Sequence, residues 1–137
     1  IKHEVSGSSG GNIGHGAEVV YFGGGTVVAG GIYYYDGTDW AITNANAEAT
    51  ASGLLGVALS GGTASSVGMC IRGMVCLSTD STGDPGDVLW LDSANNGRAA
   101  DAAPTGGGDI ARVIGYCLNA DGKRIFFNPD NTFVEIA

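Results

Sequence analysis

An internal sequence repeat constrains this chain more than any other feature of its sequence. Residues 30–36 (GGIYYYD) read like residues 86–92 (GDVLWLD), and each segment follows an apolar lead-in at the same distance. Residues 54–59 (LLGVAL) are echoed by residues 113–118 (VIGYCL) after a short insertion. Repetition of this kind is typical of tandem structural units. The sequence therefore predicts two similar β-units, over residues 17–72 and 73–130.

Short apolar segments separated by turn residues predict an all-β fold. The 25 glycines are interleaved with apolar runs, so they punctuate strands. Many short strands at intervals of roughly ten residues are typical of a barrel or a sandwich, and the length suffices for a single β-domain over residues 17–137. The expected strands cover residues 17–22, 31–35, 40–43, 54–59, 67–71, 73–77, 88–91, 98–100, 110–118, 124–127 and 132–136.

Three dipeptides predict tight hairpin turns. They are Asp36-Gly37, Asn96-Gly97 and Asp121-Gly122, because Asp or Asn followed by Gly tolerates the positive φ of such turns. Residues 44–52 contain Ala and Glu but no apolar stripe, so we expect a loop there.

The charge balance argues against two classes of partner. The net charge is −8, with six Lys plus Arg against fourteen Asp plus Glu. Phosphate-binding surfaces need clustered cations, so nucleic acid and anionic membranes are poor partners. No apolar stretch approaches the ~20 residues of a membrane span, and we expect no signal peptide before the first strand. Because residue 1 is Ile, we expect a processed product or a fragment of a longer chain.

The cysteines indicate buried thiols. Cys70, Cys76 and Cys117 lie in apolar runs, and an odd number cannot all pair within one chain. Their spacing matches no set of metal ligands. We expect free, buried thiols rather than a disulfide or a metal site, which fits assembly inside a cell better than secretion.

An active site is not evident in the sequence. His3 and His15 lie in the N-terminal segment, where a preorganised general base is not expected. Asp80, Asp84 and Asp87 crowd one turn, but their spacing does not match a calcium-binding loop, so we interpret them as solvated turn residues. We expect no enzymatic activity, no cofactor and no metal.

The N-terminal segment, residues 1–16, differs in composition from the rest. Residues 1–5 could form a short strand, and residues 6–16 are a Gly/Ser-rich connector of the kind that behaves as flexible coil. Two interpretations stay open. Ile1 and Val5 could dock on a neighbouring subunit as part of an arm, or the segment could be a disordered tail.

Two of the expected strands are apolar on both faces. A small domain that buries both faces of a strand needs a second layer or another subunit. Either loops cover the outside of a closed barrel, or these strands contact a neighbouring subunit. The alternation sets Ile32 and Tyr34 against Tyr33 and Tyr35, and Val88 and Trp90 against Leu89 and Leu91. The candidate assembly or ligand surface comprises Ile1, Val5, Tyr33, Tyr35, Trp40, Leu89 and Leu91.

Several motifs together resemble a recurrent module of tailed-bacteriophage virion proteins, found in tail fibres and in small capsid-decorating proteins. They cover most of residues 17–130. The motifs are residues 25–31 (GTVVAGG), 53–59 (GLLGVAL), 83–91 (GDPGDVLWL), 96–99 (NGRA), 113–118 (VIGYCL) and 125–130 (IFFNPD).

The resemblance implies a noncatalytic structural component of a virion, assembled in the host cytoplasm. Such a component is often a homotrimer that contacts other virion proteins. A receptor- or carbohydrate-binding β-module is the alternative, because Tyr33, Tyr35 and Trp40 could stack on a host surface glycan. The two hypotheses differ in what covers these aromatic side chains: a neighbouring subunit or a sugar.

Overall fold

The computed structural model describes residues 15–137, and its regular structure is almost entirely β, which confirms the predicted all-β class. Ile1 and Val5 lie outside the described residues. The elements are β1 His15–Val20, β2 Thr26–Val27, β3 Ile32–Tyr35, β4 Trp40–Ile42, η1 Glu48–Thr50, β5 Leu55–Ala58, β6 Gly62–Thr63, α1 Ala64–Val67, β7 Met69–Cys76, β8 Val88–Leu91, β9 Ala99–Ala100, β10 Ile110–Ala111, β11 Val113–Cys117, β12 Arg124–Phe127 and β13 Val134–Glu135.

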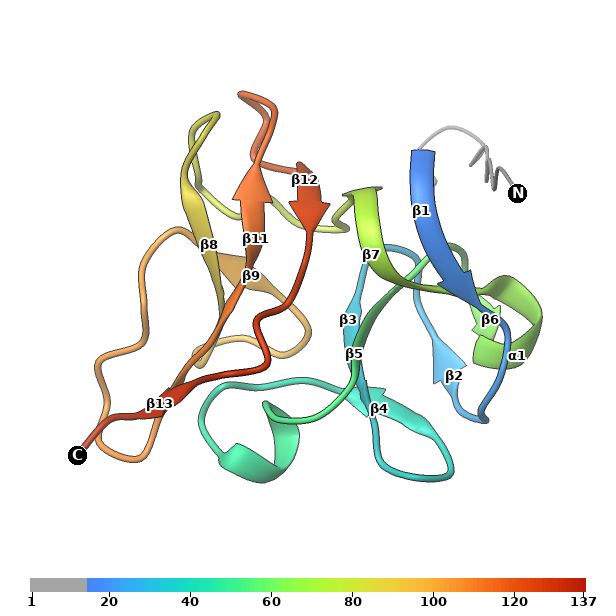
Figure 1. The fold of residues 1–137 in the computed structure, drawn as a ribbon, viewed down its shortest axis with the longest axis horizontal. Helices are drawn as coiled ribbons and strands as arrows, with labels where there is room; N and C mark the ends of the chain where they lie inside the picture. The colour runs from blue at the N-terminus through green and yellow to red at the C-terminus, as the bar shows by residue number, and fades with distance from the viewer. Residues whose placement is uncertain (1–14) are drawn as a thin grey trace.

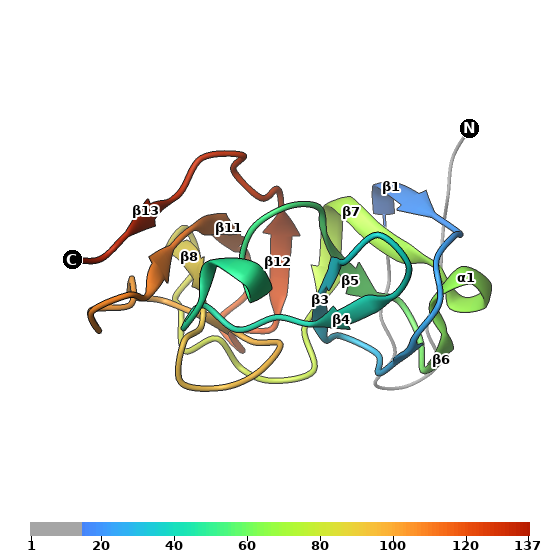
Figure 2. The same cartoon turned by 90° about the horizontal axis from the view of Figure 1, so that it is seen from below.

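One antiparallel sheet dominates the molecule. Its strand order is β4-β3-β5-β7-β12-β11-β8-β9, and β1 also pairs with β7. Figures 1 and 2 show two groups of strands side by side along the long axis, with β8, β11 and β12 in one group and β1, β3 and β5 in the other. Strand β7 lies between the groups and pairs with members of both. The small pairs β2–β6 and β10–β13 lie beside the main sheet.

The three predicted hairpins are present, but their turns are not of the predicted tight kind. Each dipeptide lies between adjacent antiparallel strands: β3 with β4, β8 with β9, and β11 with β12. Gly37, Gly97 and Gly122 have positive φ, whereas Asp36, Asn96 and Asp121 do not. The connections are also longer than two residues, so the dipeptides predicted where the chain turns and not the type of turn.

Two expectations about element bounds were wrong. The expected strands over 67–71 and 73–77 are one strand, β7, and β1 pairs along it from Met69 to Met74. The expected strand over 110–118 is divided into β10, which pairs with β13, and β11, which pairs with β8 and β12. The segment over 44–52 is a loop, as expected, and contains the single turn η1.

Strand pairing follows the same pattern in the two parts of the chain. Strand β3 pairs with β4 and β5, as β8 pairs with β9 and β11; β5 pairs with β7, as β11 pairs with β12. Backbone hydrogen bonds repeat too: the amide of Gly30 donates to Ala58 and that of Gly86 to Cys117, both at 2.8 Å. The division at residue 72 stays a prediction, since β7 runs across it.

The core has two parts, and they cover different faces of the sheet. The larger core lies between the inner face of β8, β11 and β12 and one face of β3 and β5. The smaller core, around Tyr33, Trp40 and Met69, covers the other face of β3 and β5. Strands β3 and β5 are therefore buried on both faces, whereas β8, β11 and β12 are buried on one.

The pairing of β11 with β8 is irregular between Val113 and Gly115, and this leads to a testable prediction. Gly115 has φ +153°, and a Cβ there would collide with the carbonyl oxygen of Phe126 on β12. Gly37 also has positive φ, but a Cβ there would meet nothing within 4 Å. We expect Gly37→Ala to lower the free energy of unfolding by about 1 kcal/mol and Gly115→Ala by about 3 kcal/mol or more, because only the second forces the backbone apart. Urea unfolding measures both, and equal losses would contradict this account.

Candidate functional site

The predicted surface residues of β8 are in the core, which corrects that part of the prediction. Leu89 and Leu91 are fully buried, and the opposite face of the strand carries Val88 and Trp90. Because both faces of β8 are apolar, alternation separates these two sets without showing which one points inward. The structure shows that the outward set is Val88 and Trp90.

The outward side chains form a continuous apolar row across four strands. Val88 on β8 pairs with Tyr116 on β11, Tyr116 pairs with Phe126 on β12, and Phe126 pairs with Met74 on β7. Directly paired residues project to the same face of a sheet. We call these four residues the outer row. Val88 is 37% exposed and Tyr116 is 45% exposed, while Phe126 and Met74 are half-buried.

Two arginines flank the outer row. The guanidinium of Arg72 lies over the ring of Phe126, 5.6 Å from its centroid, within the range of a cation–π interaction. Arg124 lies two residues before Phe126 on β12, so it shares the outward face. Arg72 also approaches Glu18 at 3.7 Å, but both side chains are largely exposed and the pair contributes little stability. The face is thus apolar with a cationic edge.

The corresponding row of the first half is covered. Ile32, Val57, Cys70 and Val19 are paired in the same way across β3, β5, β7 and β1. The first three are fully buried in the larger core, and Val19 packs against it. We call these four residues the inner row. Equivalent strands therefore present an apolar row in both halves, and only that of the second half faces solvent.

The predicted aromatic residues of the first half are engaged within the chain. Tyr33 and Trp40 are buried; the Tyr33 hydroxyl accepts a hydrogen bond from the amide of Val28, and Trp40 Nε1 donates to the carbonyl of Phe22, both at 2.9 Å. Tyr35 is half-buried, with its ring centroid 4.9 Å from that of Phe22. Tyr33 and Trp40 thus do not form the open stacking platform that the carbohydrate-binding alternative requires.

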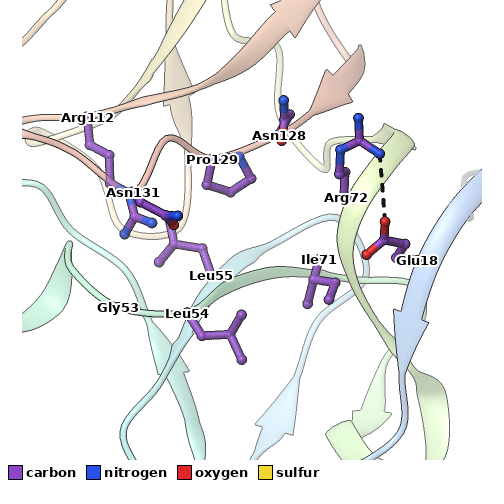
Figure 3. Close-up of a pocket in the computed structure, with 10 residues that line it drawn as sticks. All are labelled: Glu18, Gly53, Leu54, Leu55, Ile71, Arg72, Arg112, Asn128, Pro129 and Asn131. Atoms are coloured by element: carbon purple, nitrogen blue, oxygen red, sulfur yellow. Dashed lines mark ion pairs between the residues drawn. The ribbon is translucent and has the colours of Figure 1, made fainter.

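A cleft of about 160 Å³ opens beside the outer row, and Figure 3 shows its walls. Arg112 and Asn131 lie on one side of the view, and Arg72 with Glu18 lies on the other. The cationic groups therefore do not converge on one point, as a compact anion site would require. The lining residues are Glu18, Gly53, Leu54, Leu55, Ile71, Arg72, Arg112, Asn128, Pro129 and Asn131.

Arg112 holds distant segments together. Its Nε donates to the carbonyl of Asp130 and its Nη1 to the carbonyl of Ala51, each at 2.8 Å. Burial lowers the pKa of Arg112, and the carboxylate of Asp130 opposes this effect. The side chain thus ties the end of the η1 turn to the segment that follows β12.

The acidic turn and the thiols show no arrangement for metal binding. Among the described residues, no cluster of three or more His, Cys, Asp or Glu side chains could hold an ion. The carboxylate of Asp80 accepts a hydrogen bond from the amide of Thr82, and that of Asp87 from the amide of Asp84. The first bond forms an Asx turn, and the second closes the turn that precedes β8, so both acids stabilise local turns.

The chain matches no protein-family model, no curated protein and no solved structure. Its resemblance to phage virion modules stays a prediction based on the motifs. In the described part of the chain, no helix is long and apolar enough to cross a membrane.

The cysteines differ in burial, which gives a second prediction. All three are free; Cys70 and Cys117 are buried, but Cys76 is only half-buried, contrary to the expectation that all three are inside. Burial raises the pKa of Cys70 to about 11. We expect a thiol reagent at pH 8 to modify only Cys76 in the native protein and all three after unfolding. Cys76→Ser should abolish the native reaction. Rapid modification of Cys70 in the folded chain would contradict this.

A third prediction concerns Arg112. Arg112→Met leaves the buried carbonyl of Ala51 and the partly buried carbonyl of Asp130 without their donor, so we expect the free energy of unfolding to fall by about 1–3 kcal/mol. Arg98 is exposed in the same half of the chain. Arg98→Met is the matched control and should change stability by no more than about 0.5 kcal/mol. Equal effects in urea unfolding would show that the Arg112 hydrogen bonds are not stabilising.

Proposed function

We propose that this chain is a noncatalytic structural protein of a phage-like virion, of the capsid-decorating or tail-fibre kind, and that it works through contacts of its outer row with another protein. The exposed outer row is the observation that carries the proposal. An apolar row that crosses four strands with aromatic side chains and flanking arginines has the composition of a protein–protein contact. The motif resemblance supports the virion assignment.

The location of the aromatic residues favours this function over carbohydrate binding. Sugar-binding sites present aromatic faces to solvent beside convergent polar groups. Here Tyr33 and Trp40 are buried and their polar atoms bind the backbone, whereas Tyr116 is exposed among apolar neighbours. A protein partner that buries Tyr116 and Phe126 gains apolar contact area, and Arg72 and Arg124 at the edge orient it.

Particle association tests the proposed function. Particles are purified by density gradient from cells that encode the chain, and mass spectrometry quantifies the chain in the particle band. We expect many copies per particle. The variant Tyr116→Ser/Phe126→Ser should remain folded but leave the band, because it removes the central apolar contacts of the outer row.

Val28→Ser provides the matched control, since Val28 is 64% exposed and lies outside the outer row. It should incorporate at the wild-type level. A wild-type chain that is absent from the particle band would overturn the virion assignment. Full incorporation of the Tyr116→Ser/Phe126→Ser variant would show that another surface makes the contact.

A further inference from the structure

We propose that Asn96 is a site of spontaneous deamidation, and that a contact between the two halves of the chain controls how fast it is modified. Asn96-Gly97 is the one Asn-Gly dipeptide in the sequence, and it lies in the connection between β8 and β9. We call this connection the Asn96 turn. Glycine has no side chain to obstruct attack by its own backbone nitrogen, so Asn-Gly is the dipeptide most open to this reaction.

The reaction needs only the chain and water. The backbone nitrogen of Gly97 attacks Cγ of Asn96, the proton of that nitrogen passes to the side-chain amino group, and ammonia leaves. The product is a cyclic imide in which Gly97 N is bonded to Asn96 Cγ. Water then adds to one of the two imide carbonyl carbons. Opening at one carbon gives aspartate, and opening at the other gives isoaspartate, in which the main chain runs through Cβ and Cγ.

The folded chain holds both reacting groups against the first half. The amide nitrogen of Gly97 donates to the carbonyl of Thr43 at 2.8 Å. Nδ2 of Asn44 donates to Oδ1 of Asn96, also at 2.8 Å. The hydrogen that the nucleophile must lose and the side chain that it must attack are thus both engaged. The reaction requires these bonds to open.

The Asn96 turn fits closely into the first half. Asn96 is exposed, but Gly97 is buried with φ +66°. The carbonyl of Gly97 accepts a hydrogen bond from the amide of Ile32 at 3.1 Å, and a Cβ on Gly97 would collide with Cδ1 of Ile42 on β4. Such a turn can leave its place by local opening, without unfolding of the whole chain. The rate of deamidation therefore reports how often the turn is open.

The two products differ in whether the turn can return. Isoaspartate adds a carbon atom to the main chain directly before Gly97, so the amide and the carbonyl of Gly97 no longer fit Thr43 and Ile32 together. Aspartate keeps the length of the main chain and an oxygen that accepts from Asn44. We therefore expect isoaspartate, but not aspartate, to weaken the contact between the halves.

The rate of modification tests the control by folding. Peptide mapping by mass spectrometry follows the replacement of the side-chain amino group by a hydroxyl group at mildly alkaline pH. Asn96 in the folded wild-type chain should react at least about tenfold more slowly than in the urea-unfolded chain. Asn44→Asp removes the donor to Asn96 and keeps the oxygen that accepts from the amide of Asn46. It should raise the rate in the folded chain about three- to tenfold.

Two further variants separate the lost hydrogen bond from the added charge. Asn44→Ala removes the donor without a new charge and should also raise the rate. Asn46→Asp is the matched control, because Asn46 is exposed and its side chain does not contact Asn96, so it should react like the wild type. Hydrogen exchange at the Gly97 amide should accelerate in the two Asn44 variants and not in the control. Circular dichroism establishes that each variant is folded.

Urea unfolding of the products tests the consequence of the modification. Chromatography separates the chain with isoaspartate, which should unfold at a lower urea concentration than the wild type. Asn96→Asp should unfold at the wild-type concentration, since it has the charge without the longer main chain.

Four results would overturn the inference. They are equal rates in the folded and unfolded wild-type chain, no modification of Asn96 in either, Asn44 variants that react no faster than Asn46→Asp, and an isoaspartate product as stable as the wild type. None of these measurements depends on a particle or a partner, so the inference and the proposed function fail separately.

Discussion

Strand β7 is the element on which the rest of the structure depends. Its first residues pair with β5, its last residues pair with β12, and β1 pairs along its opposite edge. Gly73, with φ +137°, permits the close approach of Ala17 at the middle of the strand. Because β7 contributes to the sheet of both halves, neither half has a complete set of strand pairs without it. The larger core then forms where the two halves meet across this strand.

The strands of the first half are buried on two faces and those of the second half on one. This difference follows from the way the two halves meet across β7. The first half places its inner row in the larger core and fills its other face with Tyr33, Trp40 and Met69. The second half directs Leu89 and Leu91 into the larger core, and nothing in the described chain covers its outer row completely. The two halves therefore share a pattern of strand pairing but differ in how their apolar rows are covered. The outer row, which is not fully covered, is the candidate for contact.

Local patterns predicted the parts of the fold that local chemistry determines. Short apolar segments between turn residues located most strands, and Asp-Gly and Asn-Gly dipeptides located three hairpins. The sequence could not show which face of β8 is buried, because both faces are apolar and the answer depends on β11 and β12. Arg112 was missed for the same reason: its acceptors lie 61 and 18 residues away along the chain. The outer row could not be found without the pairing register of the strands, since its four members come from four separate strands.

The continuity of β7 also has a consequence for fragments of the chain. A cut at residue 72 divides β7, so one fragment keeps the residues that pair with β5 and the other keeps the residues that pair with β12. Strand β1 pairs with β7 on both sides of such a cut. Apolar strand edges and core side chains would then be exposed in both fragments. A boundary drawn through the middle of the repeat therefore does not separate two units that could fold alone.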